Sequence, residues 1–410
     1  MGNPISKFFY YGRFFLAPAI VLVGSLLLIL GGHWLSSFLL AMVILLTAGD
    51  LLLGEDLQEW TFEKPEYFRW VEYGAQFLSF FAIFLFLWML AAPAHDLFQF
   101  ANWVERLFGI EMWQRHQADG LWHDMAALAL AGFAGGVCAV QVGHELMHQT
   151  ANSFARALAF MGQSLCLISR IYIHHPFGHH AYAGTMQDPA TPQRGENFYV
   201  FVLRSIFGQY QQIWALERAR LHTQGISMWS LHNQALRGWV CELLVLFMVT
   251  YLAGIPGCVG FLLLGVMINV TLEFANYIQH YGLIRIEGEP FLSRHAWNDN
   301  HKMSLWFGCG IPRHAAHHMD ASVRFWQLEP MPEEAPRLAY GYLISILMAL
   351  IPVWWHQVYN SKLLTWDEQM ASERERIQGQ RANALSGQGK LVQAAIDSAQ
   401  IADFTPRSHH

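Results

Sequence analysis

Six long apolar segments limit the folds that are open to this chain. They lie near residues 14–31, 34–50, 75–93, 124–142, 239–256 and 258–275. A helix of about 20 residues spans a bilayer core of roughly 30 Å. Inside lipid each backbone N–H and C=O must be bonded within the protein, and an α-helix does this within its own segment. The sequence therefore predicts an all-α integral membrane protein with six transmembrane helices.

The connections between these segments predict two hairpins. The first two segments are separated by a Gly-Gly-His turn at 31–33, and the last two by Pro256 and Gly257, which break a helix. Two further apolar runs, 157–173 and 339–355, are interrupted by polar residues or by Pro352. We expect these two runs to lie either in the membrane interface or beneath the histidine clusters described below.

Composition supports a single membrane-embedded unit. Of the 410 residues, 54% are hydrophobic and only 14% are charged, which is typical of integral membrane proteins. We place this unit at residues 1–370 and a polar C-terminal tail, expected as a helix followed by a solvated segment, at 371–410. A formal net charge of −6 without a basic run argues against a nucleic-acid partner.

The five cysteines are scattered through the chain without a CxxC pair. This spacing excludes the usual iron–sulfur motifs, and buried free cysteines ordinarily act as small apolar residues. Any redox chemistry would therefore need electrons from another protein.

Ten histidines form four short clusters beside the apolar segments. Histidine is the commonest metal ligand among side chains and is rare in hydrocarbon, so the clusters predict a metal site at a membrane surface. They are His144 and His148 in HELMH, His174, His175, His179 and His180 in HHPFGHH, His280 in NYIQHYG, and His314, His317 and His318 in RHAAHH.

The distribution of basic residues predicts the orientation. Only Arg106 and Arg115 lie between the third and fourth segments, whereas 143–238 and 276–410 hold most of the 25 Lys and Arg. The positive-inside rule makes those two long segments cytoplasmic, together with both termini. All four clusters then lie on the cytoplasmic side of the membrane, which we expect to be a bacterial inner membrane.

The first cluster has a spacing that suits one ion. His144 and His148 are four residues apart, so both rings lie on one helical face. HELMH also matches the HExxH motif of zinc hydrolases, in which Glu145 would act as general base. This cluster alone leaves zinc and iron open.

The other clusters bring the number of candidate ligands beyond the needs of one ion. His175 and His179 have the same spacing of four and are predicted to reach one metal. Pro176 and Gly178 indicate a turn or a distorted helix, so that the adjacent His179 and His180 could face two metals. His314, His317 and His318 are expected on one helical face. A catalytic zinc needs three protein ligands, so two metals are implied, with iron favoured and copper or zinc still open.

Taken in order, HELMH, HxxxHH, NYxxHYG and RHxxHH resemble the integral-membrane di-iron alkane monooxygenases and the related xylene and p-cymene methyl hydroxylases. The resemblance covers roughly residues 10–370, and ANYIQHYGLIR, RHAWN and HHMDASVRFWQLEP are closer to the xylene monooxygenase branch. It implies two irons, O₂ as co-substrate, and hydroxylation of an unactivated methyl group of a terminal alkane or an alkyl-aromatic side chain to the primary alcohol. The implied iron ligands are His144, His148, His175, His179, His180, His280, His314, His317 and His318.

The same resemblance implies partners. The substrate would be a hydrophobic small molecule that partitions into the lipid bilayer. The electron donor would be rubredoxin with its reductase, or an iron–sulfur flavin reductase.

Several further residues are candidates for orienting the ligand rings, since a metal-bound histidine usually donates its second N–H to a neighbouring group. His174 stands where the alkane branch carries Glu, and we expect it to be a neighbour of the ligands rather than a tenth ligand. The full set is His174, Glu145, Asp188, Glu196, Glu273, His295 and His301.

Three other functions fit part of the pattern. A membrane fatty-acid desaturase or decarboxylase shares the histidine-rich di-iron plan, although the HxxxHH spacing and the HYG motif argue against it. An intramembrane zinc protease would use His144, Glu145 and His148 but would leave the other histidines unexplained. A non-catalytic metal or redox sensor is the third.

Overall fold

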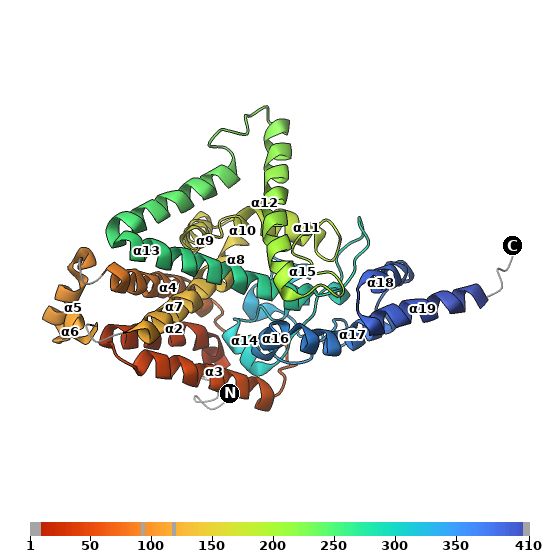
Figure 1. Cartoon of the computed structure of the whole chain (residues 1–410), viewed down its shortest axis with the longest axis horizontal. Coiled ribbons are helices and arrows are strands. Elements are labelled where there is room, and N and C mark those ends of the chain that lie inside the picture. Colours follow the sequence, from red (N-terminus) through yellow and green to blue (C-terminus); the bar gives the residue numbers. More distant parts are fainter. Residues whose placement is uncertain (1–9, 92–94, 117–119, 405–410) are drawn as a thin grey trace.

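The computed structural model describes residues 10–91, 95–116 and 120–404. These residues form helices joined by loops, and the only extended pairing among them is two isolated bridges (Figure 1). The all-α prediction is therefore confirmed for the described part of the chain.

Five helices are long and apolar enough to cross a membrane. The first four contain the first four predicted segments. They are α2 (Leu16–Leu30), α3 (Trp34–Leu52), α4 (Tyr67–Ala91) and a continuous span made of α7 (Leu121–Gly135), a π-helical turn (Gly136–Gln141) and α8 (Val142–Met147).

The fifth helix, α13 (Gln234–His280), contains both remaining segments. A straight helix of 47 residues would be about 70 Å long, more than twice the hydrocarbon thickness. The helix is instead bent at Gly254, whose φ of 65° and ψ of −161° are accessible only to glycine. The predicted break at Pro256 and Gly257 is thus two residues late. Proline is tolerated in the first turn of a helix, where its missing N–H has no partner to lose, so the bend precedes Pro256.

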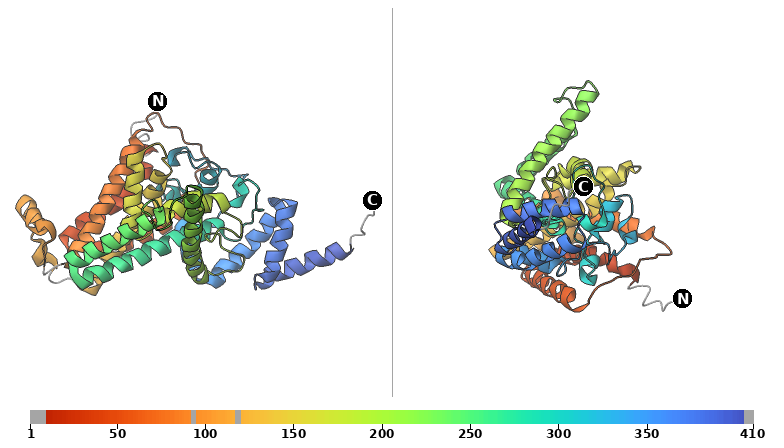
Figure 2. Two further views of the ribbon diagram at one scale, coloured as in Figure 1. Left: turned by 90° about the horizontal axis from the view of Figure 1, so that it is seen from above. Right: turned by 90° about the vertical axis from the view of Figure 1, so that its right-hand side faces the viewer.

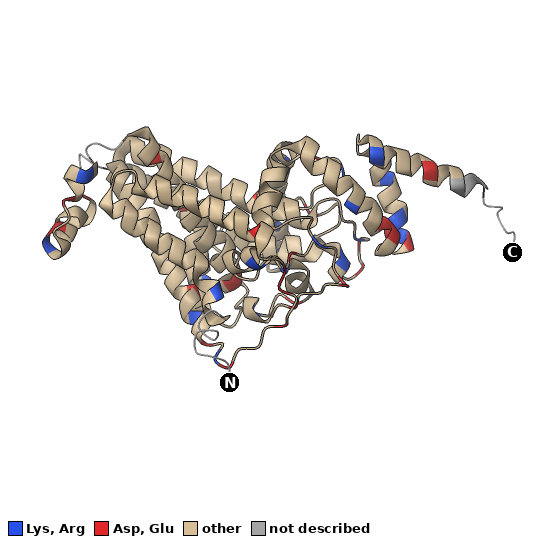
Figure 3. Ribbon diagram, turned by 90° about the horizontal axis from the view of Figure 1, so that it is seen from below, with Lys and Arg blue, Asp and Glu red and all other residues tan. Residues whose placement is uncertain are grey.

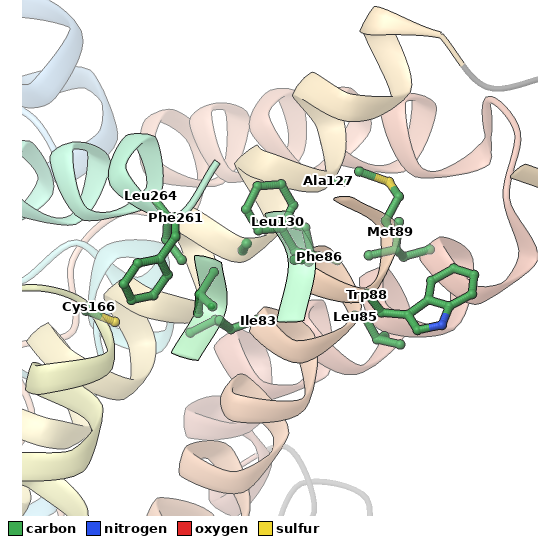
Figure 4. Close-up of a cluster of buried hydrophobic side chains, with 14 of the residues drawn as sticks. Ile83, Leu85, Phe86, Trp88, Met89, Ala127, Leu130, Cys166, Phe261 and Leu264 are labelled. Carbon is green, nitrogen blue, oxygen red and sulfur yellow. The ribbon is translucent and has the colours of Figure 1, made fainter. Parts of the chain in front are cut away.

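The core of the span region lies between α4, α7 and α13. Figure 4 shows Phe86 of α4, Leu130 of α7 and Phe261 of α13 among the side chains of one buried cluster, and all three are at most 2% exposed. Side chains on the outer faces, such as Leu243 and Phe247 of α13, remain exposed and are suited to lipid. The bundle is therefore apolar on its inside and on its outside, as a membrane domain requires.

Charged residues gather at one end of the bundle. Figure 3 shows the spans almost free of Lys, Arg, Asp and Glu, apart from the short α5 (Phe100–Phe108) and α6 (Met112–His116) at the opposite end. We call the charged end the histidine side, because α8, which carries His144, and α13, whose last residue is His280, both end there. Short helices cover it: α9 (Ser153–Leu165), α10 (Ile171–His174), α11 (His180–Tyr182), α14 (Lys302–Phe307) and α15 (His314–Met319).

The two apolar runs of uncertain placement pack on this side. The run at 157–173 is split between α9 and α10, and Arg170 between them is 1% exposed. The run at 339–355 is split between α16 (Tyr342–Ala349) and α17 (Pro352–Gln369), which meet at 118°. Pro352 is the first residue of α17, a position that suits proline.

The C-terminal residues form two helices where one helix and a solvated segment were expected. They are α18 (Glu373–Leu385) and α19 (Gly389–Phe404), and residues 405–410 lie outside the described part (Figures 1 and 2). Ser372 begins α18 with a reciprocal hydrogen-bond pair to Glu375, and Leu391 of α19 is fully buried. The boundary expected at residue 370 falls between α17 and α18. Arg194 bridges that boundary, with donor–acceptor distances of 2.6 Å to Asp367 and 2.8 Å to Asn383.

Candidate metal centre

The structure brings all nine predicted ligands together in two adjoining groups. Within each group the candidate ligand atoms lie within 4.8 Å of one another. The five-histidine group contains His144, His148, His175, His180 and His317. The four-histidine group contains His179, His280, His314 and His318.

The five-histidine group forms where the fourth span ends. His144 and His148 come from α8 and its C-terminus, and the Nε2 atom of His144 lies 2.7 Å from Nε2 of His175. His175 is in turn 2.9 Å from Nε2 of His180, which is 3.2 Å from Nε2 of His317. The expectation that His144 and His148 face one site agrees with this geometry.

The four-histidine group forms where α13 ends beside α15. Nε2 of His314 lies 2.9 Å from Nε2 of His280 and also 2.9 Å from Nε2 of His318. Three ring nitrogens thus converge on a small volume from two elements far apart in the sequence. His179 completes the group, with its ring centroid 4.7 Å from that of His280.

The geometry of the second cluster corrects the prediction that His175 and His179 reach one metal. Residues His175–His179 are π-helical, so the spacing of five replaces the spacing of four. His180 therefore follows His175 into the five-histidine group, and His179 is turned towards the other group. The adjacent His179 and His180 thus belong to different groups, and the expectation that they could face two metals stays a prediction. In α15 the single face is also divided, because His317 joins one group and His314 and His318 the other.

The distances between the ring nitrogens suit coordination of a metal ion better than hydrogen bonds between the rings. Two nitrogens bound at about 2.1 Å to one ion, at right angles, are about 3 Å apart, close to the distances above. A neutral imidazole has one N–H, so rings that meet Nε2 to Nε2 cannot satisfy every such contact by hydrogen bonds. In addition, Nε2 of His148 and Nε2 of His179 are buried without any hydrogen-bond partner.

Burial also keeps these rings in the form that binds metal. It lowers the pKa of His148 to about 4. For five other rings the pKa lies well below its usual range. Burial is the larger cause and repulsion between the rings the smaller one. These rings are His175, His180, His314, His317 and His318. Because metal ligation requires neutral imidazole, the site is prepared for an ion at neutral pH.

Among the described residues, Asp188 is the one carboxylate that hydrogen-bonds to a ring of the ligand set. Its Oδ2 atom lies 2.8 Å from Nδ1 of His179 and accepts that N–H, so the Nε2 lone pair of His179 faces the group. Thr191 donates a second hydrogen bond to the same oxygen at 2.7 Å. His174 lies outside both groups, with Nε2 at 3.7 Å from Oδ1 of Asp188. This position fits the expectation that His174 is a neighbour of the ligands.

Two other candidates have partners away from the ligand rings. Glu145 accepts a hydrogen bond from Arg324 at 3.2 Å, so its carboxylate is held by a cation rather than left free as a general base. Glu273 accepts from Gln209 at 2.7 Å and from Asn276 at 3.2 Å, and contacts no histidine in the described residues.

The last three candidates are paired with residues other than the nine histidines. Nε2 of His295 is hydrogen-bonded to Oε1 of Glu375 at 2.7 Å, and Arg294 donates two hydrogen bonds to the same carboxylate. His301 is paired with Asp299 at 2.6 Å, and Glu196 accepts from Arg204 at 2.7 Å.

Sequence reasoning missed three supporting residues. Phe291 stacks on His318 with ring centroids 4.8 Å apart, and Glu375 was assigned to the tail. Thr191 follows DPA at the position that reaches back to Asp188. Only Glu375 had a local signal, the Ser-x-x-Glu capping pattern of α18.

A cleft of about 570 Å³ opens behind the four-histidine group. Asp188 forms part of the inner wall of this cleft and is hydrogen-bonded directly to His179. Ile377, Arg381 and Leu385, at successive turns of α18, form its outer wall. Arg381 makes no ion pair or hydrogen bond from its side chain to any described residue, so it leaves one unpaired positive charge at the rim.

Comparisons with known proteins agree with this arrangement. A model of the fatty acid desaturase family matches residues 120–349, which contain all nine histidines. The alkane 1-monooxygenase of Pseudomonas putida is 34% identical over 252 residues, 60% of this chain and 62% of that protein. The xylene/toluene monooxygenase hydroxylase component XylM of Pseudomonas putida is 33% identical over 288 residues, 68% of this chain and 75% of that protein. The alkane 1-monooxygenase 1 of Alcanivorax borkumensis is 31% identical over 264 residues, 62% of this chain and 63% of that protein. The matched region thus spans less than two thirds of these two alkane 1-monooxygenases.

Proposed function

Because this chain belongs to the fatty acid desaturase family, in the group that holds the alkane 1-monooxygenases and the xylene monooxygenase hydroxylase component, we propose that it hydroxylates an unactivated methyl group with O₂. The methyl group is the terminal carbon of an alkane or belongs to the side chain of an alkyl-aromatic compound, and the product is the primary alcohol. The observation that carries the proposal is the pair of adjoining histidine groups at the end of an apolar bundle.

We propose that each group holds one iron. The ligands are the nine histidines named above, five for one ion and four for the other. Imidazole-rich sites suit iron, and two irons bound here would supply the redox chemistry that activates O₂. A single-zinc protease is disfavoured, because it leaves the second group without a role and finds Glu145 already paired with Arg324.

The protein's own residues orient and shield this centre. Asp188 holds the proton of His179 on Nδ1, which fixes the tautomer that presents Nε2. Phe291 covers the outer face of His318 and limits access of water from the loop side. The apolar bundle on the other side offers a route for a substrate that already dissolves in the bilayer.

The reaction also defines a partner. Conversion of a methyl group and O₂ to an alcohol and water consumes two electrons and two protons. The five cysteines are all free and offer no electron-transfer motif in the described residues. We propose that rubredoxin with its reductase, or an iron–sulfur flavin reductase, supplies the electrons, and that the donor docks over the cleft beside Asp188.

We propose that the protein lies in a bacterial inner membrane with the histidine side in the cytoplasm. The support is the distribution of basic residues, since α5 and α6 at the opposite end carry only Arg106 and Arg115. Both chain ends then face the cytoplasm.

A conversion assay tests the function. Cells that express the chain with a supplied reductase are given octane, dodecane, p-xylene and p-cymene under ¹⁸O₂, and products are identified by mass. The expected result is a primary alcohol with one ¹⁸O atom, together with about two irons per chain in the purified protein. An alkene product would identify a desaturase, and zinc in place of iron without conversion would overturn the proposal.

A further inference from the structure

The segment between α4 and α7 contains a short helix with three distinct sides. α5 buries Ala101 and Val104 against the core of the spans. Trp103 and Leu107, four residues apart on the neighbouring side, are 59% and 64% exposed. The residues of the third side are polar and exposed: Asn102, Glu105 and Arg106. A helix with this separation of apolar and polar residues is suited to a membrane interface, with its polar side in water.

Contacts with the last turns of α4 hold α5 in place. Oδ1 of Asp96 accepts a hydrogen bond from Nε1 of Trp88 at 2.8 Å and another from the backbone N–H of Ala101 at 2.9 Å. The second bond satisfies a first-turn N–H that has no partner within the helix. The ring centroid of Phe100 lies 5.3 Å from that of Phe84. The start of α5 therefore lies beside α4 and not beyond its end.

This position gives the start of α5 a depth in the bilayer. Phe84 lies seven residues before Ala91, the last residue of α4, which is about 10 Å along the helix. Phe98, two residues before α5, packs on Phe84 with ring centroids 6.1 Å apart and is 74% exposed. The apolar side of an interfacial helix lies about 5–10 Å into the boundary between headgroups and acyl chains. Phe98 is therefore at a depth where its exposed ring meets lipid.

Exposed aromatic side chains of the neighbouring spans continue this surface. Trp34 begins α3, and Trp122 lies at the start of α7. Tyr251 lies three residues before the bend of α13 at Gly254. All three side chains are largely exposed, and these helix ends lie with α5 at the end opposite the histidine side (Figure 1). Because Trp and Tyr concentrate where membrane meets water, Trp103 extends the lipid-facing surface of the spans onto α5.

We infer that α5 is an interfacial helix whose Trp103 and Leu107 side lies in the lipid leaflet opposite the histidine side. The bilayer itself covers this side, with Trp103 near the headgroups and Leu107 against acyl chains, while Glu105 remains in water. Lipid is the occupant because the exposed side chains are continuous with the lipid-facing side chains of the spans. The inference rests on the span assignment and does not depend on the proposed hydroxylation.

Spin labels on the full-length protein in phosphatidylcholine nanodiscs test the inference. Leu107→Cys and Glu105→Cys place a nitroxide on two different sides of the same helix. Collisions are measured with O₂, which dissolves in lipid, and with a nickel chelate, which stays in water. The label at residue 107 should collide several-fold more often with O₂ than with the chelate, and the label at residue 105 should show the reverse. The chain without an added cysteine gives the background from its own five thiols.

A variant without a label provides an independent test. Phosphatidylcholine brominated near the headgroup quenches tryptophan fluorescence at that depth, and Trp103→Phe should remove part of the quenching. Unchanged quenching in Trp103→Phe would overturn the inference, as would equal access of the chelate to both labels.

A second copy of the chain is the competing occupant. It would exclude O₂ from the label at residue 107 and bring two such labels close enough for strong dipolar coupling in liposomes. That result would also overturn the inference.

Discussion

The five-histidine and four-histidine groups share the second histidine cluster and α15 but are supported differently. In the four-histidine group Asp188 fixes His179, and Phe291 covers His318. In the five-histidine group the ring contacts among the described residues are with other histidines, and no hydrogen bond to a carboxylate is found there. The nearest carboxylate, Glu145, is turned to Arg324.

This difference indicates how each group keeps its shape. The rings of the four-histidine group are held by protein contacts before any ion binds. We expect those of the five-histidine group to depend on the ion itself to bring their lone pairs together. The following predictions test this contrast, from the largest expected effect to the smallest.

Neighbouring histidines of α15 give the strongest test, because they belong to different groups. His317→Ala should remove one ligand of the five-histidine group, and His318→Ala one ligand of the other. We expect hydroxylation below detection in both variants, with iron reduced from about two per chain to one or fewer. His148→Ala should match His317→Ala, and His179→Ala should match His318→Ala. Full iron content and activity in any of these variants would contradict that ligand assignment.

Asp188→Asn should damage the four-histidine group while the five-histidine group keeps its ligands. The amide cannot hold the Nδ1 proton of His179 as a carboxylate does, and such losses typically cost 10- to 100-fold in affinity or activity. Thr191→Val, which removes one hydrogen bond to Asp188, is the milder matched variant. Iron content and turnover should fall in the order wild type, Thr191→Val, Asp188→Asn. The contrast between the groups fails if Asp188→Asn retains wild-type iron affinity.

Glu375→Gln should loosen the loop that carries Phe291. Burial opposes ionisation of Glu375, but hydrogen bonds from His295 and Arg294 lower its pKa from 4.5 to about 2. A carboxylate with a lowered folded-state pKa stabilises the fold above its unfolded pKa and loses that effect as the pH falls towards the folded value. The variant should therefore be less stable by on the order of 1–3 kcal/mol at pH 7. Thermal unfolding at pH 7, 4 and 3 should show the difference from wild type shrinking below about pH 4.5.

His174→Ala should reduce turnover by about 10-fold or less and keep both irons. His174 lies beside Asp188 at 3.7 Å and belongs to neither group. His175→Ala, one residue away, should lose iron because its Nε2 meets two other ligand nitrogens. Iron analysis of the two variants side by side is the measurement, and the reverse order would overturn the assignment of this cluster.

Arg381→Glu should have the smallest effect and act through the electron donor. The residue lines the cleft behind Asp188, and its side chain has no ion-pair or hydrogen-bond partner in the described part of the chain. We expect the KM for an acidic donor protein to rise several-fold, with less dependence on salt, while kcat at saturating donor is unchanged. The control is Arg106→Gln at the opposite end of the bundle, which should leave the KM for the donor unchanged. Arg376 is unsuitable as a control position because its side chain donates a hydrogen bond to the carbonyl oxygen of Asp367. An unchanged KM would place the docking surface elsewhere.

Much of the fold could be predicted from the sequence because the membrane restricts it. Apolar length alone located the spans that became α2, α3, α7 and the two halves of α13. The start of α4 was placed eight residues late, because its first two turns carry the charged Arg69 and Glu72, of which Glu72 is buried within the protein. Polar residues show where a segment leaves the hydrocarbon, but the helix can continue beyond that point.

The sequence predicted which nine histidines form the site, but not how they divide into two groups. Histidine identity was visible, but the assignment of His175 and His179 to one metal assumed a regular helix. The π-helical turn moves His179 by about one residue of rotation, and only the packing of the segment against α12 (Phe198–Thr223) and α15 reveals that. Contacts such as that of Glu375 with His295 join residues 80 apart in sequence. No local pattern reports such a long-range pair.

The π-helical turn of the second cluster has a consequence for how the centre fills. His175, His180 and His179 lie within six residues yet are divided between the two histidine groups, and α15 is divided in the same way. When one ion binds, it should immobilise two short segments that also provide most ligands of the other group, three of five in the five-histidine group or three of four in the four-histidine group. The second ion then meets ligands whose conformational freedom has already been lost, so the two ions should load with positive cooperativity. Partially filled protein would then be scarce, and a titration with ferrous iron would rise steeply from empty to fully loaded chains.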